Sequence, residues 1–138
     1  MRVAERMRPV TVSLPPTASL ADAERTMTAH GLTWLPVVHA GRLVGLLGED
    51  DLAAARPSPA TTLTVGEVAY QLTTIPVTAV MRPDPPVVVR DTPLTEAAII
   101  LRDEGLEALP VVEDDEFIGV LTAEDLVGLL AADGPFGR

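Results

Sequence analysis

The sequence contains no cysteine, no lysine and few aromatic residues, which make up 3% of its 138 residues. The missing cysteines exclude disulfide bonds and thiolate metal sites. Because aromatic rings are scarce, the hydrophobic core must be aliphatic, and an apolar fraction of 47% is enough to build one. A chain of this length forms one compact unit or two small ones.

Long apolar runs and an excess of positive charge are also lacking. No run approaches the roughly 18 apolar residues that a membrane-spanning helix needs, and the first residues lack the apolar stretch of a signal peptide. The net charge is −10, and an acidic surface repels the phosphate backbone of nucleic acids. We therefore expect a soluble cytoplasmic protein with neither a membrane nor a nucleic acid as partner.

What the sequence does contain is a duplication at an offset of 74 residues. The tetrapeptide LPVV at 35–38 recurs at 109–112, and GLLGEDDL at 45–52 recurs as GVLTAEDL at 119–126. Further identities in this register are Val3/Val77, Met7–Pro9/Met81–Pro83, Leu20/Leu94, Ala23/Ala97, Gly31/Gly105 and Leu32/Leu106. A single repeat of about 50 residues buries its own faces poorly, so the two copies are expected to pack together.

Each copy predicts the order β-α-β-β-α, beginning with a β-prone run at 10–13 or 87–89. Ser19 and Thr92 are the expected N-caps of the first helices, Pro93 suits a first helical turn, and a glycine ends each helix. Apolar residues share one face of each helix: Leu20, Ala23 and Met27, then Leu94, Ala97, Ala98 and Leu101.

Two hairpins and a second helix complete the copies. The predicted strand pairs are 34–38 with 43–47 and 108–112 with 117–121. The second helices are expected to start near Glu49 and Ala123. We predict an α/β fold in which two repeats pack with pseudo-twofold symmetry into one module: repeat 1 at 1–56, a linker at 57–76, repeat 2 at 77–132 and a flexible tail at 133–138.

The ordered motifs resemble the CBS domain: Met-x-Pro, a Leu-x-x-Ala helix, Gly-Leu, Leu-Pro-Val-Val, and a closing Gly-x-x-Thr-x-x-Asp-Leu. Over residues 3–55 and 77–131 the chain is similar to a tandem CBS pair, or Bateman module. The resemblance implies one α/β unit with two clefts that bind adenosyl ligands such as AMP, ADP, ATP or S-adenosylmethionine, in a regulatory protein rather than a catalyst. It also implies a homodimer in which two pairs stack as a four-CBS disc.

The helix start near Thr122 carries the chemistry of the first cleft. A helix start offers unpaired N–H groups and a partial positive charge. Asp125, on the first turn, offers two acceptor oxygens, and a carboxylate accepts strong hydrogen bonds from hydroxyl groups such as those of a ribose. The resemblance carries the ribose and phosphate contacts onto Thr122 and Asp125. Helix capping alone is the competing interpretation of both residues.

The resemblance assigns the rest of this cleft to the start of the opposite repeat and to residues before the second strands. These positions are Met7, Val10, Thr11, Val12, Thr33, Trp34, Glu107 and Ala108. Nucleotide-binding relatives often carry a basic residue where this chain has Glu107 or Ala108. Arg8 and Arg82 are the candidate substitutes for it.

The second cleft would use Gly48, Asp51 and the segment 84–88. Gly48 removes the hydroxyl, Asp84 adds an acid, and prolines at 85 and 86 remove two backbone donors. We predict that this cleft is degenerate for nucleotides. Gly48 as a turn glycine and Asp51 as a helix cap are the structural alternative.

The leading hypothesis is a stand-alone regulatory module that binds an adenosyl ligand in the Thr122/Asp125 cleft and signals to an unidentified protein partner. The alternative is a ligand-free assembly module with vestigial clefts. Charge alone favours cationic S-adenosylmethionine over ATP. The two histidines have no partners at metal-ligand spacing and no catalytic set is found, so we expect no metal, no required cofactor and no enzymatic activity.

Overall fold

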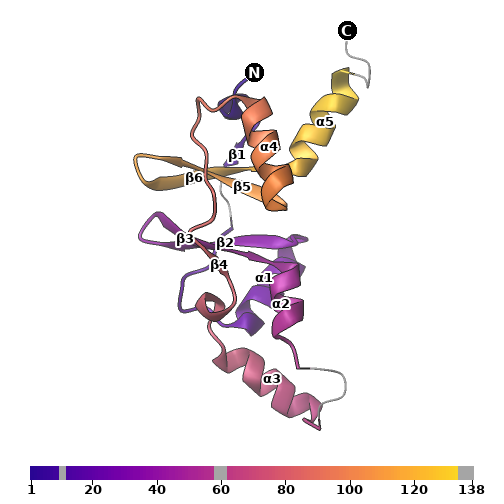
Figure 1. Ribbon diagram of the computed structural model, residues 1–138. Helices are drawn as coiled ribbons and strands as arrows, with labels where there is room; N and C mark the ends of the chain where they lie inside the picture. The colour runs from indigo at the N-terminus through magenta and orange to yellow at the C-terminus, as the bar shows by residue number, and fades with distance from the viewer. Residues whose placement is uncertain (10–11, 58–61, 134–138) are drawn as a thin grey trace. The chain divides into compact units, whose positions relative to one another are not determined.

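The computed structural model describes residues 1–9, 12–57 and 62–133, with side chains up to residue 128 (Figure 1). The chain divides into two compact α/β units. Unit 1 combines Met1–Thr11 with Pro86–Arg138, and unit 2 is Val12–Pro85. The predicted α/β class is therefore confirmed, but the chain passes from one unit to the other near residues 11 and 85, so the units do not coincide with the two sequence repeats.

Each unit is built on one of the two predicted hairpins, and both are confirmed. In unit 2, β2 (Trp34–His39) pairs antiparallel with β3 (Arg42–Gly48), and in unit 1, β5 (Ala108–Glu113) pairs antiparallel with β6 (Glu116–Thr122). A two-residue turn joins each pair of strands. All four turn residues have positive φ angles: 51° at Ala40, 80° at Gly41, 50° at Asp114 and 68° at Asp115. Turns of that hand match the right-handed twist of the flanking strands.

A third strand joins each hairpin, and it comes from the other copy of the sequence repeat. In unit 1, β1 (Arg8–Pro9) pairs antiparallel with β6, so that Arg8 lies opposite Val120. In unit 2, β4 (Arg82–Pro83) pairs antiparallel with β3. The Met-Arg-Pro segment of each copy therefore completes the sheet of the other copy.

The predicted opening strand of copy two does not form at 87–89, and in copy one Val10 and Thr11 of the run at 10–13 lie outside the described residues. Among the described residues nearby, isolated bridges form between Leu14 and Val37 and between Val88 and Val111. Prolines at 15, 16, 85 and 86 deprive these segments of N–H donors, which prevents a longer ladder.

The first helix of each repeat is α1 (Leu20–His30) or α4 (Leu94–Glu104). Ser19 caps α1 as predicted: its hydroxyl accepts from the N–H of Asp22 at 3.1 Å, and its own N–H donates to the Asp22 carboxylate at 2.9 Å. The prediction for α4 is wrong, because its N-cap is Pro93 and not Thr92. The Thr92 hydroxyl instead accepts from the N–H of Val89 at 3.1 Å and closes the preceding turn.

Both helices end as the sequence predicted, at a glycine in the left-handed region. The φ angle is 62° at Gly31 and 64° at Gly105, a conformation that costs glycine little. The second helices, α2 (Glu49–Ala55) and α5 (Ala123–Asp133), start at the predicted residues.

Two aliphatic cores fill the units. The core cluster of unit 2 is formed by the buried residues Leu14, Ala18, Leu20, Ala23, Met27, Leu35, Val37, Leu47, Leu52, Leu72 and Val77. The core cluster of unit 1 is formed by Val3, Val88, Leu94, Ala97, Leu101, Leu109, Val111 and Leu121. The predicted apolar helix faces are thus buried, apart from the partly exposed Ala98.

The segment predicted as a linker contains a helix, α3 (Val65–Thr74), longer than the one or two turns its sequence indicated. Leu72 anchors this helix in the core of unit 2, whereas Val65 and Tyr70 are 88% and 70% exposed. Short 3-10 helices lie at Val3–Glu5 and Val77–Ala79. Of the predicted tail, Asp133 is the last residue of α5, and residues 134–138 lie outside the described part of the chain.

Candidate functional site

The junction of β6 and α5 in unit 1 holds Thr122 and Asp125 in a reciprocal pair of hydrogen bonds. The N–H of Asp125 donates to the Thr122 hydroxyl at 3.1 Å, and the N–H of Thr122 donates to Asp125 Oδ2 at 3.0 Å. This is a capping box, which satisfies two backbone donors at the helix start. Thr122 is 8% exposed, and no other polar or charged residue in the described part of the chain is classed as buried. The predicted cap is therefore present.

Arg8 occupies the other oxygen of the same carboxylate. Its Nε donates to Asp125 Oδ1 at 2.6 Å, and its Nη2 lies 2.5 Å from the same atom. The Asp125 side chain is 8% exposed, whereas that of Arg8 is 62% exposed. Hydrogen bonds between two charged groups are short and strong. A residue 117 positions away in the sequence thus completes the surroundings of Asp125.

The hydrogen-bonding capacity of Asp125 is almost used up. An ionised carboxylate has about four lone-pair sites, and the three donors from Thr122 and Arg8 take three of them. A ribose diol brings two hydroxyl donors. Both hydroxyls can bind Asp125 only if Arg8 gives up at least one of its contacts.

The corresponding junction in unit 2 keeps one half of this arrangement. The N–H of Gly48 donates to Asp51 Oδ2 at 2.8 Å, so Asp51 acts on the backbone as Asp125 does. Glycine has no hydroxyl to return the bond, and no side-chain cap forms. The first turn of α2 carries three acids, Glu49, Asp50 and Asp51.

The remaining candidates of the first cleft divide between the two units. Met7 belongs to unit 1 and packs against its core. Glu107 is exposed, and its carbonyl accepts from the N–H of Ala123 at 3.3 Å. Ala108 is fully buried and lies opposite Thr122 in the hairpin. The structure thus brings Met7, Glu107 and Ala108 into the unit that holds Thr122 and Asp125.

Three candidates belong to unit 2. The carbonyl of Thr33 accepts from the N–H of Glu49 at 2.8 Å. Trp34 lies opposite Gly48 in the hairpin, and Val12 is partly buried against the core of this unit. Val10 and Thr11, which the resemblance also assigned to this cleft, lie outside the described residues. The sequence did not predict that Arg8 would contact Asp125, although it singled out Arg8 as a possible phosphate contact.

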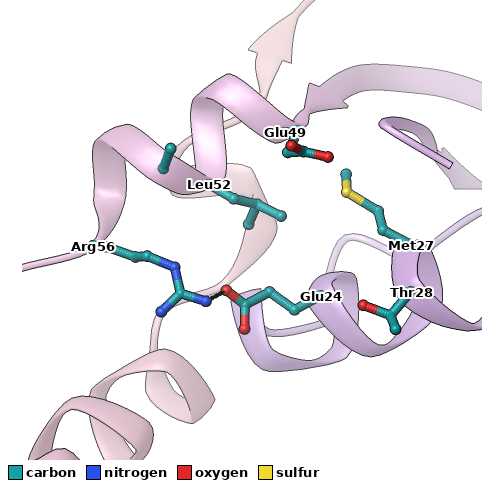
Figure 2. Close-up of a pocket in the computed structure, with 7 residues that line it drawn as sticks. Glu24, Met27, Thr28, Glu49, Leu52 and Arg56 are labelled. Carbon is teal, nitrogen blue, oxygen red and sulfur yellow. Dashed lines mark hydrogen bonds and ion pairs between the residues drawn. The ribbon is translucent and has the colours of Figure 1, made fainter. Parts of the chain in front are cut away.

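Unit 2 also has a groove of about 360 Å³ between α1 and α2 that the sequence did not indicate. Its lining residues are Glu24, Met27, Thr28, Glu49, Leu52, Ala53 and Arg56. Figure 2 shows Arg56 pointing across the groove to an ion pair with Glu24, with Leu52 and Met27 drawn above the pair. The paired charges lie 32 residues apart, so no local motif connects them. The ion pair occupies the Glu24 carboxylate and the Arg56 guanidinium, and the Glu49 carboxylate and the Thr28 hydroxyl also line the groove.

Two further properties concern the described residues. Among them, no group of three or more His, Asp or Glu side chains is arranged to hold a metal ion. None of the helices formed by residues 1–9, 12–57 and 62–133 combines the length and apolarity needed to cross a membrane.

The sequence profile of the CBS domain matches the chain twice, at residues 3–58 and 77–132. A CBS domain-containing protein of Dictyostelium discoideum is 30% identical over 114 residues, which cover 81% of this chain and 79% of that protein.

An inosine-5′-monophosphate dehydrogenase of Korarchaeum cryptofilum is 30% identical over 116 residues, which cover 83% of this chain and 21% of the dehydrogenase. The chain therefore spans only about a fifth of that enzyme. Among solved structures, CBSX2 of Arabidopsis thaliana in complex with AMP has a TM-score of 0.80 at 28% identity, covering 95% of this chain and 97% of that one.

Proposed function

The chain belongs to the CBS-domain family, and we propose that it is a regulatory module without catalytic activity that binds an adenosyl ligand at Thr122 and Asp125. The ligand is AMP, ADP, ATP or S-adenosylmethionine. The module works in the cytoplasm as a homodimer and signals to a protein partner through ligand-dependent geometry. A ligand shifts that geometry only by as much as it binds the two forms with different affinity.

The observation that carries this proposal is the Asp125 carboxylate at the start of α5, held beside the Thr122 hydroxyl and the Arg8 guanidinium. Asp125 is fixed by the N–H of Thr122, with 8% of its side chain exposed, at a helix terminus that attracts negative groups. The position is thus preorganised for a ligand that presents hydroxyl donors beside an anionic group. A sugar phosphate has that combination.

A relative supports the choice of ligand. CBSX2, which is 28% identical to this chain, crystallised in complex with AMP. The acidic composition, with a net charge of −10, argues separately against polyanionic nucleic acids as partners.

Calorimetric titration tests the proposal. AMP, ADP, ATP, adenosine and S-adenosylmethionine are titrated into the intact chain and into Asp125→Ala. At least one ligand is expected to bind the intact chain with an affinity that Asp125→Ala reduces at least about tenfold, since hydrogen bonds to a charged group contribute about 1.5–3 kcal/mol. The matched control is Asp51→Ala, which removes the corresponding acid of unit 2 and is expected to leave binding unchanged. Silence from all five ligands at millimolar concentration would overturn the proposal.

A second candidate function is ligand-free assembly. It is favoured by the ion pair in which Arg8 already occupies Asp125 Oδ1. It is also favoured by Glu107 and Ala108, which stand where nucleotide-binding relatives often carry a basic residue. Under this alternative, Thr122 and Asp125 are a helix cap and the protein dimerises with or without nucleotides. The same titration separates the two functions, and sedimentation of the intact chain with and without AMP measures whether the ligand alters assembly.

A further inference from the structure

We propose that Arg8 is a built-in competitor for Asp125 that makes the site selective for adenosyl ligands carrying phosphate. This inference rests on the proposed function and specifies its ligand class. Without ligand, two nitrogens of Arg8 hold Asp125 Oδ1, at 2.6 Å and 2.5 Å. When both hydroxyls of a ribose bind Asp125, the guanidinium gives up at least one of its contacts with Oδ1, and another anion can then pair with it.

The backbone around Arg8 is held in place, so only the Arg8 side chain moves when a ligand replaces it at Asp125. β1 is locked against β6, because a Cβ at Gly119 would collide with the carbonyl oxygen of Arg8 and come within 2.9 Å of Met7 Cε. The Arg8 Cα is therefore fixed beside the start of α5. Its side chain is 62% exposed, so the guanidinium can swing while its attachment stays in place.

The charge of the ligand then decides the outcome. A phosphate supplies a new partner for the displaced guanidinium, and arginine pairs well with phosphate oxygens. Neutral adenosine breaks the ion pair and supplies no anion as a new partner for the guanidinium. S-adenosylmethionine carries its sulfonium cation on the 5′ carbon of the ribose, close to the released guanidinium, and the two positive charges repel each other. The order of affinity is therefore AMP above adenosine above S-adenosylmethionine, the reverse of the preference that net charge alone gives.

Arg8→Ala tests the inference, with AMP and adenosine titrated into the intact chain and the variant. Removal of the competitor is expected to strengthen adenosine binding about threefold, in line with the modest strength of a partly exposed ion pair. AMP binding weakens by a similar factor because its phosphate loses a partner, so the ratio of the two affinities falls about tenfold. The matched control is Arg90→Ala, which makes the same charge change in unit 1 at an exposed pair with Glu113. It is expected to leave the ratio unchanged.

The outcomes separate this inference from the proposed function. If Arg8→Ala weakens or strengthens both ligands by one factor, Arg8 has only a structural role and the inference is wrong while the binding site stands. The same conclusion follows if the intact chain binds adenosine as tightly as AMP. If neither protein binds either ligand, the proposed function fails and the selectivity of Arg8 fails with it.

Discussion

The two units build their second helix from nearly the same sequence, yet they begin it differently. In both, an aspartate on the first turn accepts from the N–H of the N-cap residue, at 3.0 Å in unit 1 and 2.8 Å in unit 2. Only Thr122 returns a hydrogen bond through its side chain, because Gly48 has none. The aspartate is thus explained by capping in both units, and it does not identify a ligand site by itself. What distinguishes unit 1 is the added threonine beside an aspartate held by Arg8.

The largest difference between the units concerns how tightly each hairpin holds its third strand, β1 in unit 1 and β4 in unit 2. Gly119→Ala places a methyl group against the backbone carbonyl of Arg8, which cannot move without displacing β1. At Gly45→Ala the three nearest atoms to the new methyl group all belong to the side chain of Met81, which is flexible. We expect Gly119→Ala to lower the free energy of unfolding by about 1–3 kcal/mol, as overpacking does, and Gly45→Ala by about 1 kcal/mol or less. Urea unfolding checks both, and equal losses would contradict the account.

A smaller effect is expected from substitutions at the two N-cap residues, Thr122 and Gly48. Thr122→Ala removes a side-chain cap and should lower the free energy of unfolding by about 1 kcal/mol. Gly48→Thr introduces the missing hydroxyl at a residue with φ of −109°, which threonine adopts readily, and should raise the free energy by a few tenths of a kcal/mol. Thermal unfolding measures both. A destabilised Gly48→Thr protein would mean that unit 2 cannot accommodate the cap of unit 1.

The smallest effect concerns the first helices, and it depends on pH. The N–H of Ser19 donates to the Asp22 carboxylate, and this hydrogen bond lowers the pKa of Asp22 below its usual 3.8. Burial acts in the opposite direction, whereas the Ser19 hydroxyl and Arg25 lower the pKa further. A lowered pKa stabilises the fold above the unfolded value, and that stabilisation is lost as the pH falls through the folded value.

Asp22→Asn should therefore cost a few tenths of a kcal/mol at pH 7, a small figure because the side chain is 42% exposed. The cost should vanish at pH values well below the folded pKa. Glu96→Gln is the control, since it lies at the matching position of α4, whose N-cap Pro93 forms no side-chain bond. Urea unfolding across the acidic range measures both variants, and a pH-independent cost of Asp22→Asn would refute the assignment.

Features that depend on neighbouring residues could be predicted from the sequence. The hairpins follow from β-prone runs that flank polar turns, and Gly31 and Gly105 mark helix ends because glycine tolerates a positive φ. The cap at Thr92 was predicted wrongly because the Thr92 hydroxyl accepts a hydrogen bond from the N–H of Val89 in the preceding turn and not from an N–H of the helix. The helix starts after Pro93 without a side-chain cap.

Features that depend on distant residues left no signal in local patterns. The exchange of β1 and β4 between the copies is not visible in local periodicity, since each strand has only two residues. Only the resemblance to the CBS domain placed the start of one repeat beside Thr122 and Asp125 of the other. The sequence identified Thr122 and Asp125, but the contact of Asp125 with Arg8 appears only once β1 lies beside β6. That contact also changes the expected ligand preference, because it adds a local cation that the net charge conceals.

The most direct test of the central claim is to observe which helix start meets the ligand. AMP is titrated into the ¹⁵N-labelled intact chain while the backbone amide signals of both units are followed by NMR. We predict that the signals of residues 122–125 move in a saturable way and that those of 48–51 stay in place. Movement confined to 48–51, equal movement at both helix starts, or no movement at all would contradict the claim that unit 1 holds the ligand.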